Sequence, residues 1–176
     1  MSGLLRMVYV STATNPVDEK AGQVQVDVGR ILLQSRKNNP KIEVGGVLYF
    51  SNNFFFQCLE GEQDVVNQLY QNISTDPRHT NIQTLSVERI DQRRFSNWSM
   101  KYVATKDKVT SVLQQHGKTD FNPYLFDAEM IEAVLSIFTD EVDTTSEPDQ
   151  NYSDQSTLSQ VQRKGFFSKL FNRFKT

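Results

Sequence analysis

The chain has 176 residues, of which 38% are hydrophobic and 23% charged, and its formal net charge at pH 7 is −2. This length suits one compact domain with a terminal extension, and such a domain can bury a core without disulfides or metals. The slightly acidic balance disfavours nucleic acid as a partner. One cysteine, Cys58, and two histidines exclude an intrachain disulfide and disfavour a zinc site. We expect a cytoplasmic protein, because no apolar run approaches the roughly 20 residues that span a bilayer and the N-terminus lacks a signal-peptide layout.

The hydrophobic pattern predicts the order β-α-β-β-α-β-β over the first 103 residues. The predicted strands and helices are, in chain order, 4–11, 23–37 (helix), 44–50, 54–60, 62–74 (helix), 82–90 and 97–103. A helix between the first two strands requires a crossover, and the tight turn at 51–53 implies a hairpin. We therefore predict a ferredoxin-like α+β sandwich with one extra strand, in which the first and third strands are neighbours.

Beyond this sandwich the pattern changes twice. Residues 106–142 are predicted to form a helical extension, because apolar residues recur at helical spacing within 126–138. Residues 143–162 are acidic and polar without lysine or arginine, which predicts a disordered linker. Residues 163–176 are basic, and their phenylalanines recur at helical spacing, which predicts an amphipathic tail helix.

Because this fold class carries many activities, function has to be inferred from a site. Gln57 lies between bulky apolar residues on one face of the third strand, and a buried unpaired amide would cost about 1–3 kcal/mol. It therefore bonds either a protein neighbour or a ligand. Tyr9 on the adjacent first strand can meet it, and Ser35 and Asn39 near the end of the first helix lie over the same region. Amides that donate and accept suit a planar heterocycle with carbonyl and imide edges.

Other functions found in this fold class require residues that this sequence does not have. The aromatic segment 54–60 has no basic or glycine framework of an RNA-recognition strand. Residues 10–22 contain no arginine for the anion loop of an acylphosphatase-like enzyme. Cys58 has no obvious base beside it, so an inert buried thiol is its simpler interpretation.

Six segments follow one another in the order and spacing of a known family: VYVS (8–11), ILLQSRKNNP (31–40), GGVLYF (45–50), FFFQCLEGE (54–62), STDPRH (74–79) and FSNWSMKYV (95–103). They resemble the BLUF domain, a flavin-based sensor of blue light. The resemblance implies a sensor domain over residues 1–105, FAD rather than FMN as the cofactor, and no enzymatic activity. The remainder resembles the short BLUF class, which carries two C-terminal helices and no attached enzyme.

The resemblance also implies roles for individual residues. Tyr9 matches the photoactive tyrosine, which gives the excited flavin an electron and then a proton. Gln57 matches the glutamine that links this tyrosine to flavin N5 and the C4 carbonyl and rearranges in the light. Asn39 matches the contact to the C4 carbonyl and N3 edge, Asn38 a second polar flavin contact, and Ser35 a serine near the glutamine.

Two further groups follow from the same resemblance. Trp98 and Met100 match a last-strand pair that is associated with signal output, although ordinary core packing is an alternative for both. Asp76, Arg78 and His79 match the segment near the ribityl and phosphate side of the flavin.

The sequence departs from the family pattern in three places. Asn72 stands where the second helix usually carries an arginine or lysine directed at the flavin. Glu43-Val44-Gly45-Gly46 replaces the usual G-I-T-G, and the loop 12–22 is longer and more polar than expected. These departures affect the phosphate side and leave the Tyr9–Gln57–Asn39 set intact.

The resemblance favours a non-catalytic module that passes its signal to a downstream regulatory protein or through a homo-oligomer. A conventional flavoenzyme and a flavin-free interaction module are the alternatives. Three alternatives remain for the tail 163–176. It lies on the inner face of an anionic membrane, it docks on a protein surface, or it is a frayed end.

Overall fold

The computed structural model describes residues 3–14, 23–97, 99–103 and 106–140, with side chains from residue 28 onward in the first helix. Contacts divide the chain into residues 1–143 and 144–176, and every described residue belongs to the first unit. The predicted tail helix, the whole of the predicted linker, and Trp98 lie outside the described residues.

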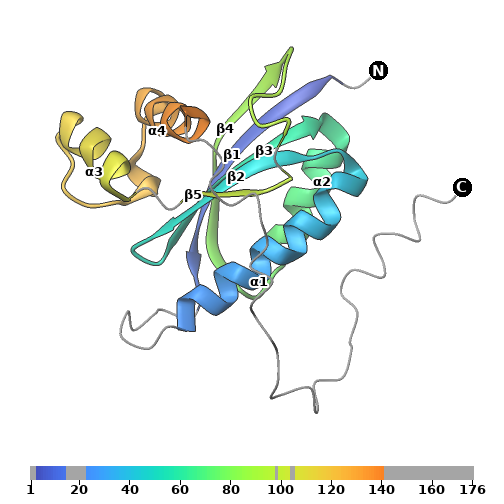
Figure 1. Ribbon diagram of the computed structural model, residues 1–176, viewed down its shortest axis with the longest axis horizontal. Helices are drawn as coiled ribbons and strands as arrows, with labels where there is room; N and C mark the ends of the chain where they lie inside the picture. Colours follow the sequence, from blue (N-terminus) through green and yellow to red (C-terminus); the bar gives the residue numbers. More distant parts are fainter. Residues whose placement is uncertain (1–2, 15–22, 98, 104–105, 141–176) are drawn as a thin grey trace, which may run out of the picture. The chain divides into compact units, whose positions relative to one another are not determined.

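Five strands form one sheet in the order β4-β1-β3-β2-β5 (Figure 1). The strands are β1 (Leu4–Ala13), β2 (Gly45–Ser51), β3 (Phe54–Glu62), β4 (His79–Ile90) and β5 (Lys101–Val103). The helices are α1 (Gln23–Asn38), α2 (Gln63–Ser74), α3 (Lys106–Gln115) and α4 (Ala128–Asp140), with 3-10 turns η1 (Asn39–Ile42) and η2 (Pro123–Leu125). β2 and β5 pair in parallel and the other neighbours are antiparallel. This is the predicted ferredoxin-like α+β sandwich with one extra strand.

The last predicted strand is shorter in the structure. The last strand, predicted at 97–103, is confined to Lys101–Val103. The carbonyls of Ser99 and Met100 instead accept hydrogen bonds from the side chains of Asn39 and Arg36. The predicted C-terminal helical extension contains two α-helices, α3 and α4, separated by residues 116–127. The Asp127 carboxylate caps α4 by accepting from the Met130 amide.

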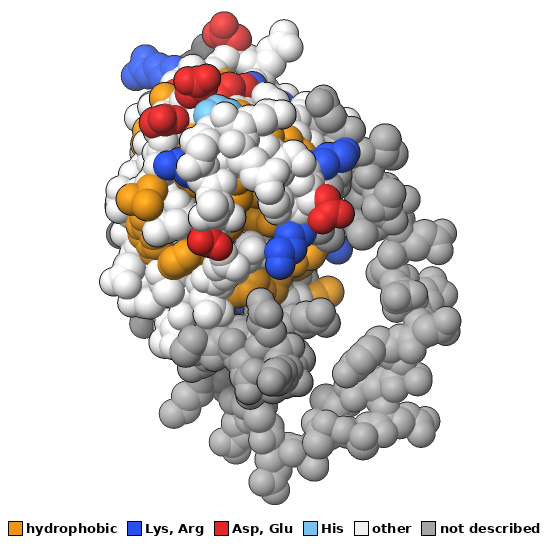
Figure 2. All heavy atoms as spheres, turned by 90° about the vertical axis from the view of Figure 1, so that its left-hand side faces the viewer, with side chains coloured by type: hydrophobic (Ala, Val, Ile, Leu, Met, Phe, Trp, Pro, Cys, Tyr) orange, Lys and Arg blue, Asp and Glu red, His pale blue; other side chains and the backbone are white. Residues whose placement is uncertain are grey.

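Each face of the sheet has its own pair of helices and its own core (Figure 1). Alternation along β1 directs Met7 and Tyr9 toward α1 and α2, whereas Val8 and Val10 face α3 and α4. The α4 side chains that close the second core are Met130, Ile131, Val134, Leu135 and Phe138. Basic side chains are scattered over the face drawn in Figure 2 and do not gather into one patch there.

Backbones approach closely where β2 begins. A Cβ built on Gly46 would lie 2.2 Å from the carbonyl oxygen of Cys58 in β3, a distance that real Cβ atoms do not adopt. A Cβ on Gly29, within α1, would meet nothing within 4 Å. The two glycines therefore respond oppositely to the same substitution.

We expect Gly46→Ala to lower the free energy of unfolding by at least about 2 kcal/mol, because β2 and β3 must separate to admit the methyl group. Gly29→Ala is the matched control and should raise the free energy by about 0.5–1 kcal/mol through helix propensity. Urea denaturation of the full chain measures both. Equal midpoints for the two variants would contradict the close approach.

Candidate functional site

The site is centred on a hydrogen bond between two neighbouring strands. Tyr9 of β1 is paired with Gln57 of β3 in the sheet register, and both side chains face α1 and α2. The Tyr9 hydroxyl donates to Gln57 Oε1, and the two residues are 0% and 2% exposed. Gln57 Nε2 lies 3.6 Å from the sulfur of Met100. A thioether is a weak acceptor, so the amide is held firmly at its oxygen and loosely at its nitrogen.

The surroundings of Tyr9 keep its phenol protonated. Burial raises the pKa of Tyr9 well above 10, with smaller contributions from Tyr70, Asp76 and Cys58. Tyr70 of α2 packs edge-on against Tyr9 with ring centroids 5.2 Å apart, and its own hydroxyl accepts from Thr84 on β4. The Tyr9 phenol therefore stays protonated and donates its proton to the hydrogen bond with Gln57.

The C-terminal end of α1 holds the chain that leads into β5. Asn39 is buried, and its Nδ2 donates to the Ser99 carbonyl at 2.7 Å. Arg36 Nε donates to the Met100 carbonyl at 3.1 Å. Ser35 and Asn38 are half-buried, and the side chain of Asn38 makes no capping bond to η1. Asn39 and Met100 therefore join the Tyr9–Gln57 pair, while Ser35 and Asn38 lie on the same helix without a described polar contact to it.

The turn before β4 forms a second polar group. Asp76 and Arg78 are hydrogen-bonded, with Arg78 Nε 2.9 Å from Asp76 Oδ1, and Arg78 Nη2 donates to Gln34 of α1 at 2.9 Å. Burial opposes ionisation of Asp76, but the bonds and charge of Arg78 lower its pKa below the ordinary value. The pair ties the turn to α1.

His79 lies in the same turn on the inner side. Its Nδ1 is 2.8 Å from Ser11 Oγ, and its ring is 4.6 Å from that of Phe55. Burial lowers the pKa of His79 to about 4, against a smaller opposing effect of Asp76. His79 is therefore neutral near pH 7. Ser11 was not among the predicted site residues, although strand alternation from Tyr9 places both on one face.

Two buried side-chain nitrogens among the described residues have no hydrogen-bond partner: Asn72 Nδ2 and Arg94 Nη1. An unpaired buried donor costs about 1–3 kcal/mol, so the Asn72 amide on α2 would be stabilised by a ligand acceptor.

The family model described as "Sensors of blue-light using FAD" (BLUF) matches residues 4–101. The chain belongs to the BLUF family. Domains of this family sense blue light with a flavin and signal to effectors, so the matched region is a sensor module rather than an enzyme. None of the described helices is long and apolar enough to cross a membrane.

Curated relatives and solved structures agree with this assignment. The photoactivated adenylate cyclase subunit beta of Euglena longa is 30% identical over 124 residues, which are 67% of this chain and 14% of that protein. The blue light- and temperature-regulated antirepressor BluF of Escherichia coli (strain K12) is 37% identical over 91 residues, 49% of this chain and 23% of that protein. The chain thus spans about a seventh of the length of the cyclase relatives.

Two solved structures cover most of the described part. The ground state of BlsA has a TM-score of 0.72 at 35% identity and covers 80% of this chain and 91% of that chain. The dark state of BlrB has a TM-score of 0.60 at 26% identity and covers 78% of this chain and 98% of that chain. The similarity to these two structures covers about four fifths of the chain, more than the residues 4–101 that the family model matches.

We expect the stability of the protein to fall as the pH decreases from 6.5 to 4. The unfolded chain protonates His79 near pH 6.5, whereas burial lowers the pKa in the folded state to about 4. The unfolded state therefore binds more protons in this window, and the free energy of unfolding rises with pH. His79→Asn keeps a polar partner for Ser11 without titrating, so its decline should be shallower. Denaturation at pH 7.5 and 5 measures this, and identical declines would contradict a neutral buried His79.

Proposed function

We propose that Tyr9 and Gln57 are the photoactive pair of this sensor and that FAD is its chromophore, held between α1 and α2. The observation that carries the proposal is the buried hydrogen bond from the Tyr9 hydroxyl to Gln57 Oε1. It joins an oxidisable phenol to an amide whose other end has only a weak acceptor, Met100. The family description, which names FAD, favours FAD over FMN.

A bound flavin that absorbs blue light would supply an electron acceptor beside Tyr9. Tyr9 would lose an electron to it, and the phenol, then strongly acidic, would release its proton along the existing bond to Gln57 Oε1. Return of the electron and a proton to Tyr9 would leave the Gln57 amide rearranged. Protonation at the oxygen end favours a rotated or tautomeric amide at Gln57, which then presents a different donor and acceptor pattern. The amide is therefore the element with two stable arrangements.

The remaining polar residues would bind and orient the flavin. Asn39 and Asn38, at the end of α1, would contact its carbonyl and imide edge, with Ser35 near the glutamine. Asn72 would donate its unpaired amide hydrogen to a flavin acceptor, in place of the usual basic residue.

The turn before β4 would adjoin the ribityl and phosphate side of the flavin. Arg78 forms an ion pair with Asp76, and His79 closes the inner side as a neutral ring. Trp98 and Met100 would pass the change at Gln57 onward. The receiver is proposed to be a partner protein, as with the antirepressor relative, whose name describes light regulation.

Tyr9→Phe should bind flavin and lose the photoreaction. The wild-type protein is expected to show a flavin spectrum that shifts slightly to the red under blue light and relaxes in the dark. Tyr9→Phe has no hydroxyl proton to pass to Gln57, so its spectrum should not shift. Tyr70→Phe is the matched control, because it removes a neighbouring hydroxyl outside the proposed pair and should retain the shift. Absorption spectroscopy decides, and mass analysis of the released chromophore distinguishes FAD from FMN.

Two results would contradict the proposed pair. A Tyr9→Phe protein that still shifts would remove Tyr9 from the photoreaction. A wild-type protein whose flavin only bleaches would indicate redox chemistry of another kind.

Asn72→Leu should stabilise the flavin-free protein but weaken its binding of flavin. Without flavin, the substitution removes an unpaired buried donor, so the free energy of unfolding should rise by about 1 kcal/mol. With flavin, a hydrogen bond is lost and the dissociation constant should increase about tenfold. Gln71→Leu, on an exposed position of the same helix, should change neither quantity by much. Flavin titration and urea denaturation measure the two effects, and unchanged affinity in Asn72→Leu would contradict the contact.

A further inference from the structure

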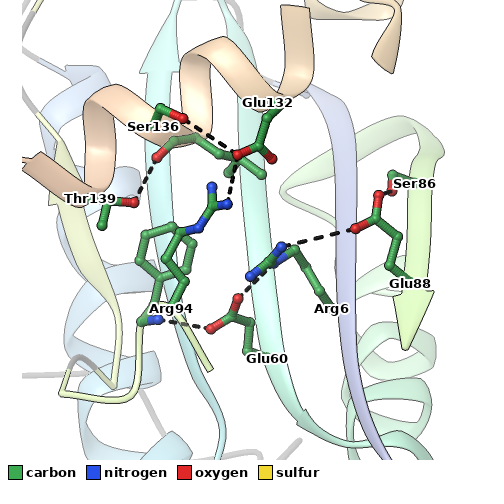
Figure 3. Close-up of polar contacts among 10 residues, drawn as sticks. Arg6, Glu60, Ser86, Glu88, Arg94, Glu132, Ser136 and Thr139 are labelled. Carbon is green, nitrogen blue, oxygen red and sulfur yellow. Dashed lines mark hydrogen bonds and ion pairs between the residues drawn. The ribbon is translucent and has the colours of Figure 1, made fainter. Parts of the chain in front are cut away.

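A buried ion pair lies on the face of the sheet opposite to Gln57 (Figure 3). Arg6 Nε on β1 is 2.7 Å from Glu60 Oε1 on β3, and Glu60 is 0% exposed. The second oxygen of Glu60 accepts from the backbone amide of Phe95 at 2.8 Å. A carboxylate buried with both oxygens paired is strongly held. Glu60 therefore anchors the chain between β4 and β5 at Phe95.

The described residues 94–97 and 99–101, here called the connecting segment, contact both layers of the protein. On the side of α1 and α2, the Met100 sulfur lies against Gln57 Nε2. The carbonyls of Ser99 and Met100 accept from Asn39 and Arg36. A change at the Gln57 amide therefore acts directly on the C-terminal half of this segment.

On the other side, the connecting segment contacts α4 at two points. Arg94 Nη2 is 2.6 Å from Glu132 Oε1, with side chains 25% and 53% exposed (Figure 3). Lys101 Nζ donates to the carbonyl of Phe138 in α4, at 3.4 Å. The segment thus joins Gln57 to α4 with the Glu60-bound Phe95 between them.

We propose that Arg94 and Glu132 are a positioning pair that couples the photoreaction at Gln57 to α4. This inference rests on the proposed function of Tyr9 and Gln57. The pair is partly exposed, so it is worth only about 0.2–1 kcal/mol. An interaction of this size biases an equilibrium between two arrangements without locking it. The buried Glu60–Phe95 bond is the pivot: a displacement at Met100, on the C-terminal side of Phe95, turns Arg94, on its N-terminal side, relative to Glu132.

The effect of the Arg94–Glu132 pair on the lifetime of the light-induced state follows from which contacts are present in the same arrangement. The Arg94–Glu132 pair is present while Met100 lies against the Gln57 amide, so it stabilises that arrangement. Rearrangement of the amide removes its N–H from the sulfur, displaces the connecting segment and loosens the pair. Loss of the pair lowers the cost of the displaced arrangement, so the light-induced state should persist longer.

The test is the dark-recovery rate of the red-shifted flavin absorption in the flavin-loaded full chain. Glu132→Arg should slow recovery by about two- to fivefold, the change that 0.4–1 kcal/mol produces. The charge-swapped double variant Arg94→Glu/Glu132→Arg should return the rate to within about twofold of wild type, because it restores attraction. Glu129→Arg is the matched control: it makes the same charge change on α4, one turn away and outside the connecting segment, and should recover at the wild-type rate.

A second measurement reads α4 itself. Amide hydrogen exchange in residues 128–140 should be faster under blue light than in the dark for the wild type, and already faster in the dark for Glu132→Arg. Wild-type recovery in Glu132→Arg, or a double variant that stays slow, would overturn the coupling role. A wild-type protein that binds flavin but forms no red-shifted state would instead overturn the proposed function.

Discussion

The hydrogen bond between Tyr9 and Gln57 depends on the adjacency of β1 and β3, two central strands that are far apart in sequence. Antiparallel pairing sets the two residues opposite each other, and burial excludes water that would otherwise compete for the phenol proton. The crossover helix α1 and the hairpin between β2 and β3 are needed to place the strands in this order. The order of strands in the sandwich therefore determines that the Tyr9 hydroxyl meets the Gln57 amide.

Strand alternation gives the two faces of the sheet different chemistry. Gln57 faces α1 and α2, while Cys58 and Glu60 face α3 and α4. Burial and the neighbouring Glu60 carboxylate raise the pKa of the Cys58 thiol, so it remains protonated and unreactive. The single cysteine is thus part of the scaffold, and the polar chemistry is divided between Gln57 on one face and Glu60 on the other.

The elements that depend on local pattern could be predicted from the sequence. Period-two alternation gave the strands, helical spacing gave α1 and α2, and their order gave the topology that brings Tyr9 to Gln57. The short β5 could not be predicted, because it depends on side chains from Asn39 and Arg36 that take the carbonyls before it. The burial of Glu60 was also missed, since its partner Arg6 is 54 residues away and a glutamate at a strand end is typically exposed.

The polar groups on the two faces differ in how completely they are satisfied. Glu60 has both oxygens paired, whereas Gln57 offers its nitrogen to a thioether and Asn72 has an unpaired donor. Each unsatisfied group destabilises the chain by itself, yet a ligand can bind there because it has no strong protein bond to displace. Arg94 Nη1 on the α4 side is also unpaired, so unsatisfied donors occur on both faces of the sheet. The Glu60 carboxylate, with both oxygens paired, is the fixed reference against which a small change at Gln57 can move the connecting segment.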